Sequence, residues 1–334
     1  MPAKPWPERP TITHTLLLAL ILALGFTLRL AQPTLVEFKR DEATIVRLGQ
    51  AIAYEGYRPA VGVDSSLGID NLPLTLYLMA LPLRVWADPL SAVVFTCLLN
   101  SLALVGCYAL ARIAFGKQEA LLATLLFAVS PWAVLYARKV WARTLPLFTV
   151  IFMGSLFFAF ARRKPWALVP AFISLAALIG LQLEALAFAP LLALCLLLYR
   201  QEVRWRPLLT GAVAFGLLFL PYVVHDGLHG WENARGLLDY AGASSGFSWD
   251  AVRYAYELMG SRGIAGQAGS LHRDFRQSLR PLWWLNTGLD LLLLGGVGYA
   301  GHQIAWGVTE ARRRTFTLLM LWFVLPILLQ LRPS

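Results

Sequence analysis

Residues 167–199 read ALVPAFISLAALIGLQLEALAFAPLLALCLLLY, an apolar stretch that is interrupted only at Gln182 and Glu184. As a single helix rising about 1.5 Å per residue, the stretch would be about 50 Å long, far beyond the roughly 30 Å hydrocarbon core of a bilayer. We therefore predict two short helices that turn at 182–184. Paired apolar helices of this kind are typical of a helical membrane protein.

The composition points to the same class. Hydrophobic residues make up 58% of the 334 residues and charged residues 14%, with a mean hydropathy of +0.60. Soluble chains are about 45–50% apolar and about 25% charged. The apolar segments are continuous and do not alternate, which disfavours an outer-membrane barrel. A net charge of +10 indicates cytoplasmic loops near anionic head groups, and no motif of a nucleic-acid binder is present.

We predict an all-α polytopic membrane protein with about nine transmembrane helices in one domain, 1–334. No small-residue cleavage site of a signal peptide follows the first apolar run, so we interpret this run as an uncleaved span. The predicted spans are 12–31, 90–111, 120–137, 144–161, 167–182, 186–199, 207–225, 285–307 and 315–331.

The short apolar segment 72–86 decides the topology, because counting it as a span reverses every later loop. If it does not span, the basic clusters fall on one side of the membrane. These include Lys4 and Arg9, Arg112 and Lys117, 162–164, 200–206 and 312–314. That side is cytoplasmic by the positive-inside rule. We therefore expect 72–86 to lie in the membrane interface.

Two long outer segments follow from this topology, outer loop one at about 32–89 and a second outer loop at about 226–284. The second is rich in aromatic residues, as suits helices lying on a membrane surface. Long loops inside a membrane protein are usually functional. The chain stops at Ser334 directly after a predicted span, which leaves open that the sequence is truncated.

Outer loop one contains Phe38-Lys39-Arg40-Asp41-Glu42-Ala43. Adjacent carboxylates at a membrane face are costly to keep for packing alone. We interpret Asp41 as a catalytic base at the membrane–water boundary and Glu42 as its neighbour in the motif. The alternative is an ordinary interfacial acid that pairs with Arg40 or Lys39.

A short predicted outer loop breaks the charge rule with three cations, Arg138, Lys139 and Arg143. Cations kept on that side suggest an anionic ligand, for which phosphate is the first candidate. The alternative is that these side chains only snorkel at span ends.

Several short motifs carry a resemblance to a known family. They are the Asp41-Glu42 pair after the first span, Asn71-Leu72-Pro73-Leu74-Thr75-Leu76-Tyr77, Phe115-Gly116, and Ser130-Pro131 followed by Tyr136-Ala137-Arg138. In this layout the chain resembles the C-type (GT-C) membrane glycosyltransferases. It is most similar to family 39-like enzymes, the group of protein O-mannosyltransferases and aminoarabinose transferases.

The resemblance implies a polyprenyl-phosphate sugar donor, an outer-face active site and inversion at the anomeric carbon. Asp41 would be the base, and Asn71, Tyr77 and Glu184 would line the site or contact the acceptor. Family members often carry a histidine where this chain has Glu184, and many continue with further spans beyond a point like Ser334. Glu184 could instead cap a hairpin that faces water.

We expect no cofactor, and the sequence leaves a divalent metal ion open. His225, Asp226 and His229 lack a third ligand group, so we interpret them as the solvated start of the second outer loop. Cys97, Cys107 and Cys195 lie in apolar runs without metal-ligand spacing and are predicted to be small core residues.

The function predicted from these features is transfer of a sugar from a polyprenyl-phosphate donor to a lipid, glycan or protein acceptor at the extracytoplasmic face of a bacterial inner or plasma membrane. One alternative is a transporter or lipid flippase, which would use carboxylates in the middle of the membrane and repeated helices. No internal repeat is visible in the chain. A second alternative is an inactive or scaffolding relative of the transferases.

Overall fold

The chain folds into a bundle of helices, described here from a computed structural model. The description covers residues 11–35, 38–65, 68–141, 145–243, 249–258, 262, 264 and 272–329. Within these residues there is no β-strand, and the only β-bridge is an isolated one between Asp64 and Asp70. The prediction of an all-α fold is therefore confirmed for the described part of the chain.

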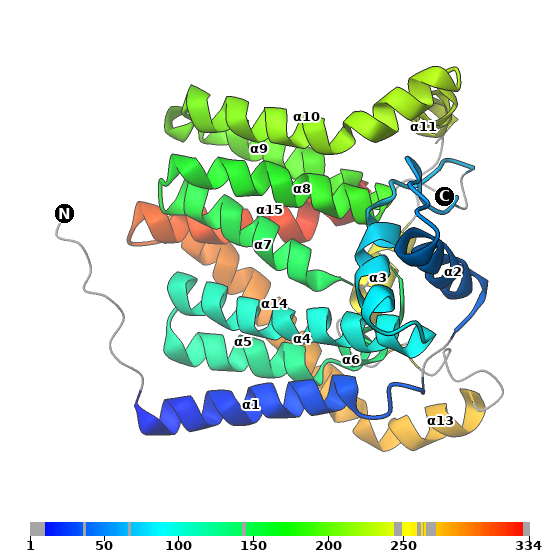
Figure 1. Cartoon of the computed structure of the whole chain (residues 1–334). Helices are drawn as coiled ribbons and strands as arrows, with labels where there is room; N and C mark the ends of the chain where they lie inside the picture. Colours follow the sequence, from blue (N-terminus) through cyan, green and yellow to red (C-terminus); the bar gives the residue numbers. More distant parts are fainter. Residues whose placement is uncertain are drawn as a thin grey trace.

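The apolar helices of the bundle run alongside one another, with α14 crossing obliquely behind the others (Figure 1). They are α1 (Ile12–Leu30), α4 (Pro89–Ala114), α5 (Lys117–Val129), α7 (Pro146–Leu156), α8 (Leu168–Leu181), α9 (Ala189–Leu198), α10 (Trp205–Leu228), α14 (Trp283–Trp306) and α15 (Glu310–Leu329). Each lies on one of the predicted apolar runs. Among the described residues, α1, α4 and α10 are long and apolar enough to cross a membrane.

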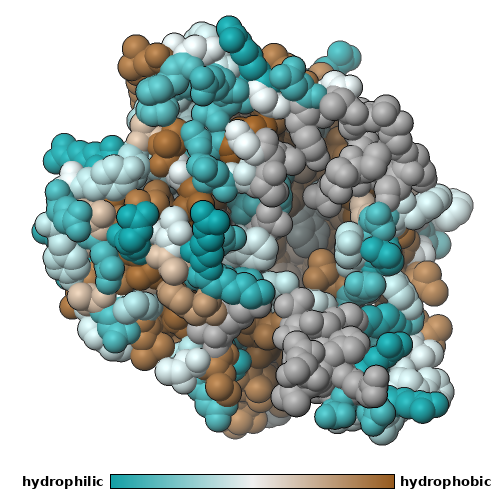
Figure 2. Space-filling model, turned by 90° about the vertical axis from the view of Figure 1, so that its right-hand side faces the viewer, coloured by the Kyte–Doolittle hydropathy of each residue, from teal (hydrophilic) through white to brown (hydrophobic). Residues whose placement is uncertain are grey.

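Helices of 6 to 15 residues gather at one end of the bundle, at the right of Figure 1. They are α2 (Arg40–Tyr54), α3 (Leu74–Val85), α6 (Pro131–Tyr136), α11 (Glu232–Ala243), α12 (Asp250–Leu258) and α13 (His272–Leu279). Figure 2 views this end directly, and hydrophilic side chains are spread over it with hydrophobic ones between them. Both predicted outer loops therefore lie at the same end, which we call the short-helix end.

The helix breaks have local causes. Gln182 is extended, with φ −153° and ψ 127°, and ends α8, so the predicted turn at 182–184 is confirmed. The run 120–137 is not one helix, because α5 ends at Val129. Ser130 then accepts from the Ala133 amide at the start of α6. Pro131 fits this first helical position, where no amide hydrogen is needed.

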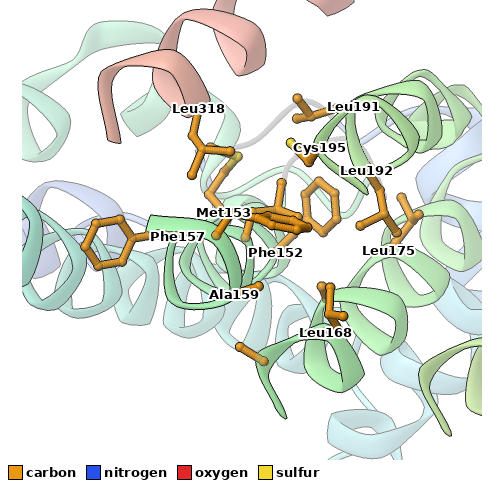
Figure 3. Close-up of a cluster of buried hydrophobic side chains, with 14 of the residues drawn as sticks. Phe152, Met153, Phe157, Ala159, Leu168, Leu175, Leu191, Leu192, Cys195 and Leu318 are labelled. Atoms are coloured by element: carbon orange, nitrogen blue, oxygen red, sulfur yellow. The ribbon is translucent and has the colours of Figure 1, made fainter. Parts of the chain in front are cut away.

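The main core lies among α7, α8, α9 and α15 (Figure 3). Phe152, Leu168 and Leu191 are fully or almost fully buried there, with Leu318 reaching in from α15. Cys195 belongs to this cluster, and Cys97 is buried in a second one, so the prediction of core cysteines is confirmed for both. Cys107 is only partly buried.

The second cluster fixes the short-helix end to the bundle. It joins Ile45 and Val46 of α2 to Leu76 and Met79 of α3, and its other buried members are Leu83, Ala92, Val93, Cys97 and Val140. Helix α3 has 12 residues, which makes it about 18 Å long and too short to cross a roughly 30 Å core. Helices α7 and α9 are shorter still, with 11 and 10 residues, so the interfacial position of 72–86 stays a prediction.

The opposite end carries the turns 115–117, 162–164, 199–204 and 307–309 and the arginine cluster 312–314 at the start of α15, and we call it the basic end. Ion pairs there join the turns 162–164 and 199–204 to the start of α15. The Arg163 guanidinium lies 3.2 Å from the Glu202 carboxylate and also contacts Glu310. Arg314 pairs with the same two carboxylates, at 3.0 and 2.5 Å. The two ends of the bundle thus differ in charge as well as in shape.

Candidate functional site

Helix α2 carries the Asp41-Glu42 pair in its first turn. Its buried residues Ile45, Val46 and Gly49 recur at helical spacing and face α3. Glu42 closes the start of the helix, because its Oε2 atom accepts from the Lys39 amide at 2.9 Å. Carboxylates in the first turn also interact favourably with the helix dipole, by about 0.3–1 kcal/mol for exposed groups.

The two acids have different surroundings. Glu42 is 2% exposed, whereas Asp41 is exposed at the surface. The Asp41 carboxylate makes no hydrogen bond or ion pair with any residue that the structure describes. Neighbours on a helix point about 100° apart, so one side chain can face inward while the next faces out. Asp41 is thus available to a ligand.

Glu42 joins the acidic motif to the predicted cationic loop. Its Oε1 atom lies 3.5 Å from the Lys139 ammonium. Lys139 also lies over the Trp141 ring, 4.7 Å from its centroid, and Val140 packs into the cluster that holds α2. The structure therefore brings together two motifs that lie almost a hundred residues apart in the sequence.

Arg138 has structural partners. Its Nε atom donates to the Arg29 carbonyl at 3.2 Å and its Nη2 atom to the Leu28 carbonyl at 2.5 Å. These carbonyls end α1 and have no partner within the helix. Arg138 thus closes the end of α1, and its role in phosphate binding stays a prediction. Arg143 lies outside the described residues.

Arg29 was missed by the sequence reasoning. It is fully buried, and its guanidinium donates to the Ala128 and Phe127 carbonyls at the end of α5, both at 2.9 Å. A lone arginine in the last turn of an apolar run was the available signal. Arg29 and Arg138 together tie the ends of α1 and α5 to the cationic loop.

Asn71 and Tyr77 hold outer loop one in place. The side-chain Nδ2 atom of Asn71 donates to the Val63 carbonyl at 2.8 Å, and its Oδ1 atom accepts from the backbone amide of Leu183 at 3.1 Å. The Tyr77 hydroxyl donates to the Pro59 carbonyl at 3.0 Å. Glu184 follows Leu183 and is exposed. The structure therefore places Asn71 beside the turn that carries Glu184, while the lining role of these residues stays a prediction.

The two outer loops meet at Asp70, a junction that the sequence did not reveal. The Asp70 amide donates to the Asn233 side chain at 2.7 Å, and the Tyr222 hydroxyl donates to the Asp70 carbonyl at 2.9 Å. Burial, and secondarily the Asp64 carboxyl against it, raises the pKa of the Asp70 carboxyl above its ordinary value. The junction connects the loop that carries Asp41 to the start of α11.

Asp226 is not part of a solvated loop start, contrary to the prediction. It is buried within α10, which extends to Leu228, and its two carboxylate oxygens accept from the Asn233 and Ala234 amides at 2.9 and 3.1 Å. It is buried because it satisfies the free amides at the start of α11. His225 and His229 stack on each other with centroids 4.0 Å apart.

Across the described ranges, no group of three or more His, Cys, Asp or Glu side chains is arranged to hold a metal ion.

Comparison with known proteins finds no matching family model, curated protein or solved structure. The likeness to the C-type membrane glycosyltransferases thus rests on the short motifs quoted above.

Proposed function

We propose that this protein is an integral membrane glycosyltransferase that moves a sugar from a polyprenyl-phosphate donor to an acceptor hydroxyl, with inversion at the anomeric carbon. The observation that carries the proposal is the difference in surroundings between the neighbouring acids Asp41 and Glu42. Asp41 is exposed, while Glu42 is buried against Lys139. One carboxylate is open to an acceptor, and its neighbour holds a cation nearby.

The proposed setting is a bacterial inner or plasma membrane that the nine apolar segments cross, with the basic end in the cytoplasm. The positive-inside rule counts cations in short loops, and it supports this orientation because the short connections of the basic end carry the clusters 162–164 and 200–206, with 312–314 at the start of α15. The short-helix end would then lie at the extracytoplasmic face. A lipid-linked donor could approach Asp41 there from the outer leaflet.

In the proposed reaction, the Asp41 carboxylate accepts the proton of the acceptor hydroxyl as its oxygen attacks the anomeric carbon. The bond from that carbon to the donor's phosphate oxygen breaks, and the phosphate leaves with the bonding electrons. Attack from the face opposite the phosphate inverts the anomeric centre. A positioned general base contributes roughly 10²–10⁴-fold to such a step.

Lys139 is the proposed electrostatic partner of the departing phosphate, which gains negative charge as the bond breaks. Glu42 and the Trp141 ring together hold the ammonium group in place. Arg138 has guanidinium donors besides the two bound to α1 and could add a charge-assisted hydrogen bond. Arg143 belongs to the same proposed phosphate site.

Asn71, Tyr77 and Glu184 are the proposed lining of the acceptor side. The hydrogen bonds of Asn71 and Tyr77 fix the backbone of outer loop one, and Asn71 also binds the turn next to Glu184. A rigid loop would hold the acceptor in an attacking position and exclude water, which would otherwise hydrolyse the donor.

The test is a transfer assay with the purified protein in liposomes of native lipid extract. A panel of radiolabelled polyprenyl-phosphate sugars is supplied, and labelled product is followed over time. Transfer from one donor would support the proposal and identify the sugar. Absence of product with every donor would contradict it and favour the transporter or scaffolding alternatives.

A further inference from the structure

Trp132, in the first turn of α6, holds part of the second outer loop. Its indole Nε1 atom donates to two backbone carbonyls, that of Glu257 at 3.1 Å and that of Arg262 at 3.2 Å. Glu257 lies in the last turn of α12, where a carbonyl has no partner within the helix. The Trp132 side chain thus closes the end of α12 and also binds Arg262 beyond it.

Arg262 is bound to α14 as well. Its guanidinium pairs with the Asp290 carboxylate at 2.5 Å and lies over the Tyr256 ring, 4.2 Å from its centroid. The Tyr256 hydroxyl also donates to Asp290, at 3.3 Å. Asp290 is the one acidic residue in the sequence of α14, and an acid in an apolar helix is costly to leave unpaired. The ion pair therefore anchors this part of the second outer loop to the bundle.

Trp132 is also connected to the cationic loop, through α6. Its ring stacks on the Tyr136 ring one turn further along, with centroids 5.6 Å apart and an angle of 13° between the planes. The Tyr136 carbonyl accepts from the Lys139 amide at 3.1 Å. Ala137 and Val140 are buried in the same turn. Helix α6 and the start of the cationic loop are therefore packed as one continuous unit.

The cations at the far end of this unit are attached to two further helices. Arg138 donates to the carbonyls that end α1, and Lys139 pairs with Glu42 of α2. One short segment, from Trp132 to Lys139, thus contacts the second outer loop at its start and α1 and α2 at its end. A displacement of the second outer loop would have to break the Trp132 hydrogen bonds or shift the two cations.

We propose that Trp132 is a positioning residue of the transferase site, which couples the order of the second outer loop to the placement of Arg138 and Lys139. The inference rests on the proposed function, since it takes these two cations to bind the donor phosphate. Cations that are held in place before the donor arrives lose less conformational freedom on binding, which raises the affinity. Asp41 depends less on this link, because α2 is fixed by its own packing on α3.

The first experiment measures transfer at varied donor concentration in the liposome assay for wild type, Trp132→Phe, Asp290→Asn and the double variant. Phenylalanine keeps an aromatic ring against Tyr136 but lacks the N–H group, and Asp290→Asn removes the charge that binds Arg262. Each single substitution should raise the KM for the donor roughly two- to tenfold, as expected for a lost hydrogen bond, and leave kcat nearly unchanged. The double variant should be little worse than the more affected single one, because both substitutions act through the same link.

The matched control is Trp166→Phe, the same substitution at an exposed tryptophan of the basic end, and it should leave the KM unchanged. A fall in kcat without a change in KM would overturn the proposal, because a positioning role in donor binding predicts the opposite split. Effects that multiply in the double variant would also overturn it, since they would indicate two independent roles.

Hydrogen exchange of the donor-free full chain separates this inference from the proposed function, because it requires no transfer. Trp132→Phe should exchange faster than wild type both in α12 and in the peptide that contains Lys139. Faster exchange in α12 alone would overturn the coupling, whatever the transfer assay gives. Faster exchange in both, together with no transfer by wild type, would support the coupling and contradict the proposed function.

Discussion

Asp41 and Glu42 are neighbours in the chain, yet one is exposed and the other is buried with two partners, the Lys39 amide and the Lys139 ammonium. The sequence predicted that the pair mattered without distinguishing the roles, because the inward side of α2 is set by its packing on α3. The long-range contact to Lys139 has no sequence signal, since nothing local links position 42 to position 139.

Glu42→Gln is expected to destabilise the fold, because it leaves the Lys139 charge without its carboxylate partner. The expected loss in the free energy of unfolding is about 1–3 kcal/mol, measured by urea unfolding in detergent micelles. Asp41→Asn, at an exposed site, should change it by less than about 0.5 kcal/mol. Equal effects of the two substitutions would contradict the assigned environments.

Arg138→Ala should lower the unfolding free energy by about 1.5–3 kcal/mol, since it removes charge-assisted hydrogen bonds from the two carbonyls that end α1. The variant should also bind a polyprenyl-phosphate donor more weakly, as followed by an equilibrium binding titration. Weaker folding with unchanged donor affinity would leave Arg138 with the structural role alone.

At the scale of elements, the apolar runs predicted where the long helices lie and where α8 gives way to α9. They did not predict the helix break at Ser130, because one serine and one proline did not interrupt the apolar run from which the span was predicted. Nor did they predict the Asp70 junction, which depends on packing between segments more than 150 residues apart.

The Asp70 junction should depend on pH. Burial raises the pKa of the Asp70 carboxyl, so the folded protein binds this proton more tightly than the unfolded chain does. The stabilisation is therefore present below the ordinary Asp pKa of about 3.9 and is lost as pH rises through the raised value. Exchange protection of the Asp70 and Asn71 amides, corrected for intrinsic rates, should fall with rising pH. Asp70→Asn, with Asp239→Asn as control, should remove this dependence.

At the scale of the whole molecule, the short helices gather at one end and the basic turns at the other, as the loop charges had indicated. The membrane orientation proposed from this can be tested with single cysteines. Leu81→Cys, at an exposed position of α3, should react with an impermeant reagent added outside, and Lys164→Cys only after permeabilisation. Cys97 and Cys195 are buried and should contribute little background. The reverse pattern would contradict the topology.

The central claim is that Asp41 is the base of a sugar transfer, and it is tested most directly by comparing wild type, Asp41→Asn and Asp239→Asn in the liposome assay. Asp239 is an exposed acid on α11 and serves as the matched control. The account predicts product with wild type and Asp239→Asn, and a rate at least about 10²-fold lower with Asp41→Asn, with donor binding preserved. Full activity in Asp41→Asn would contradict the claim.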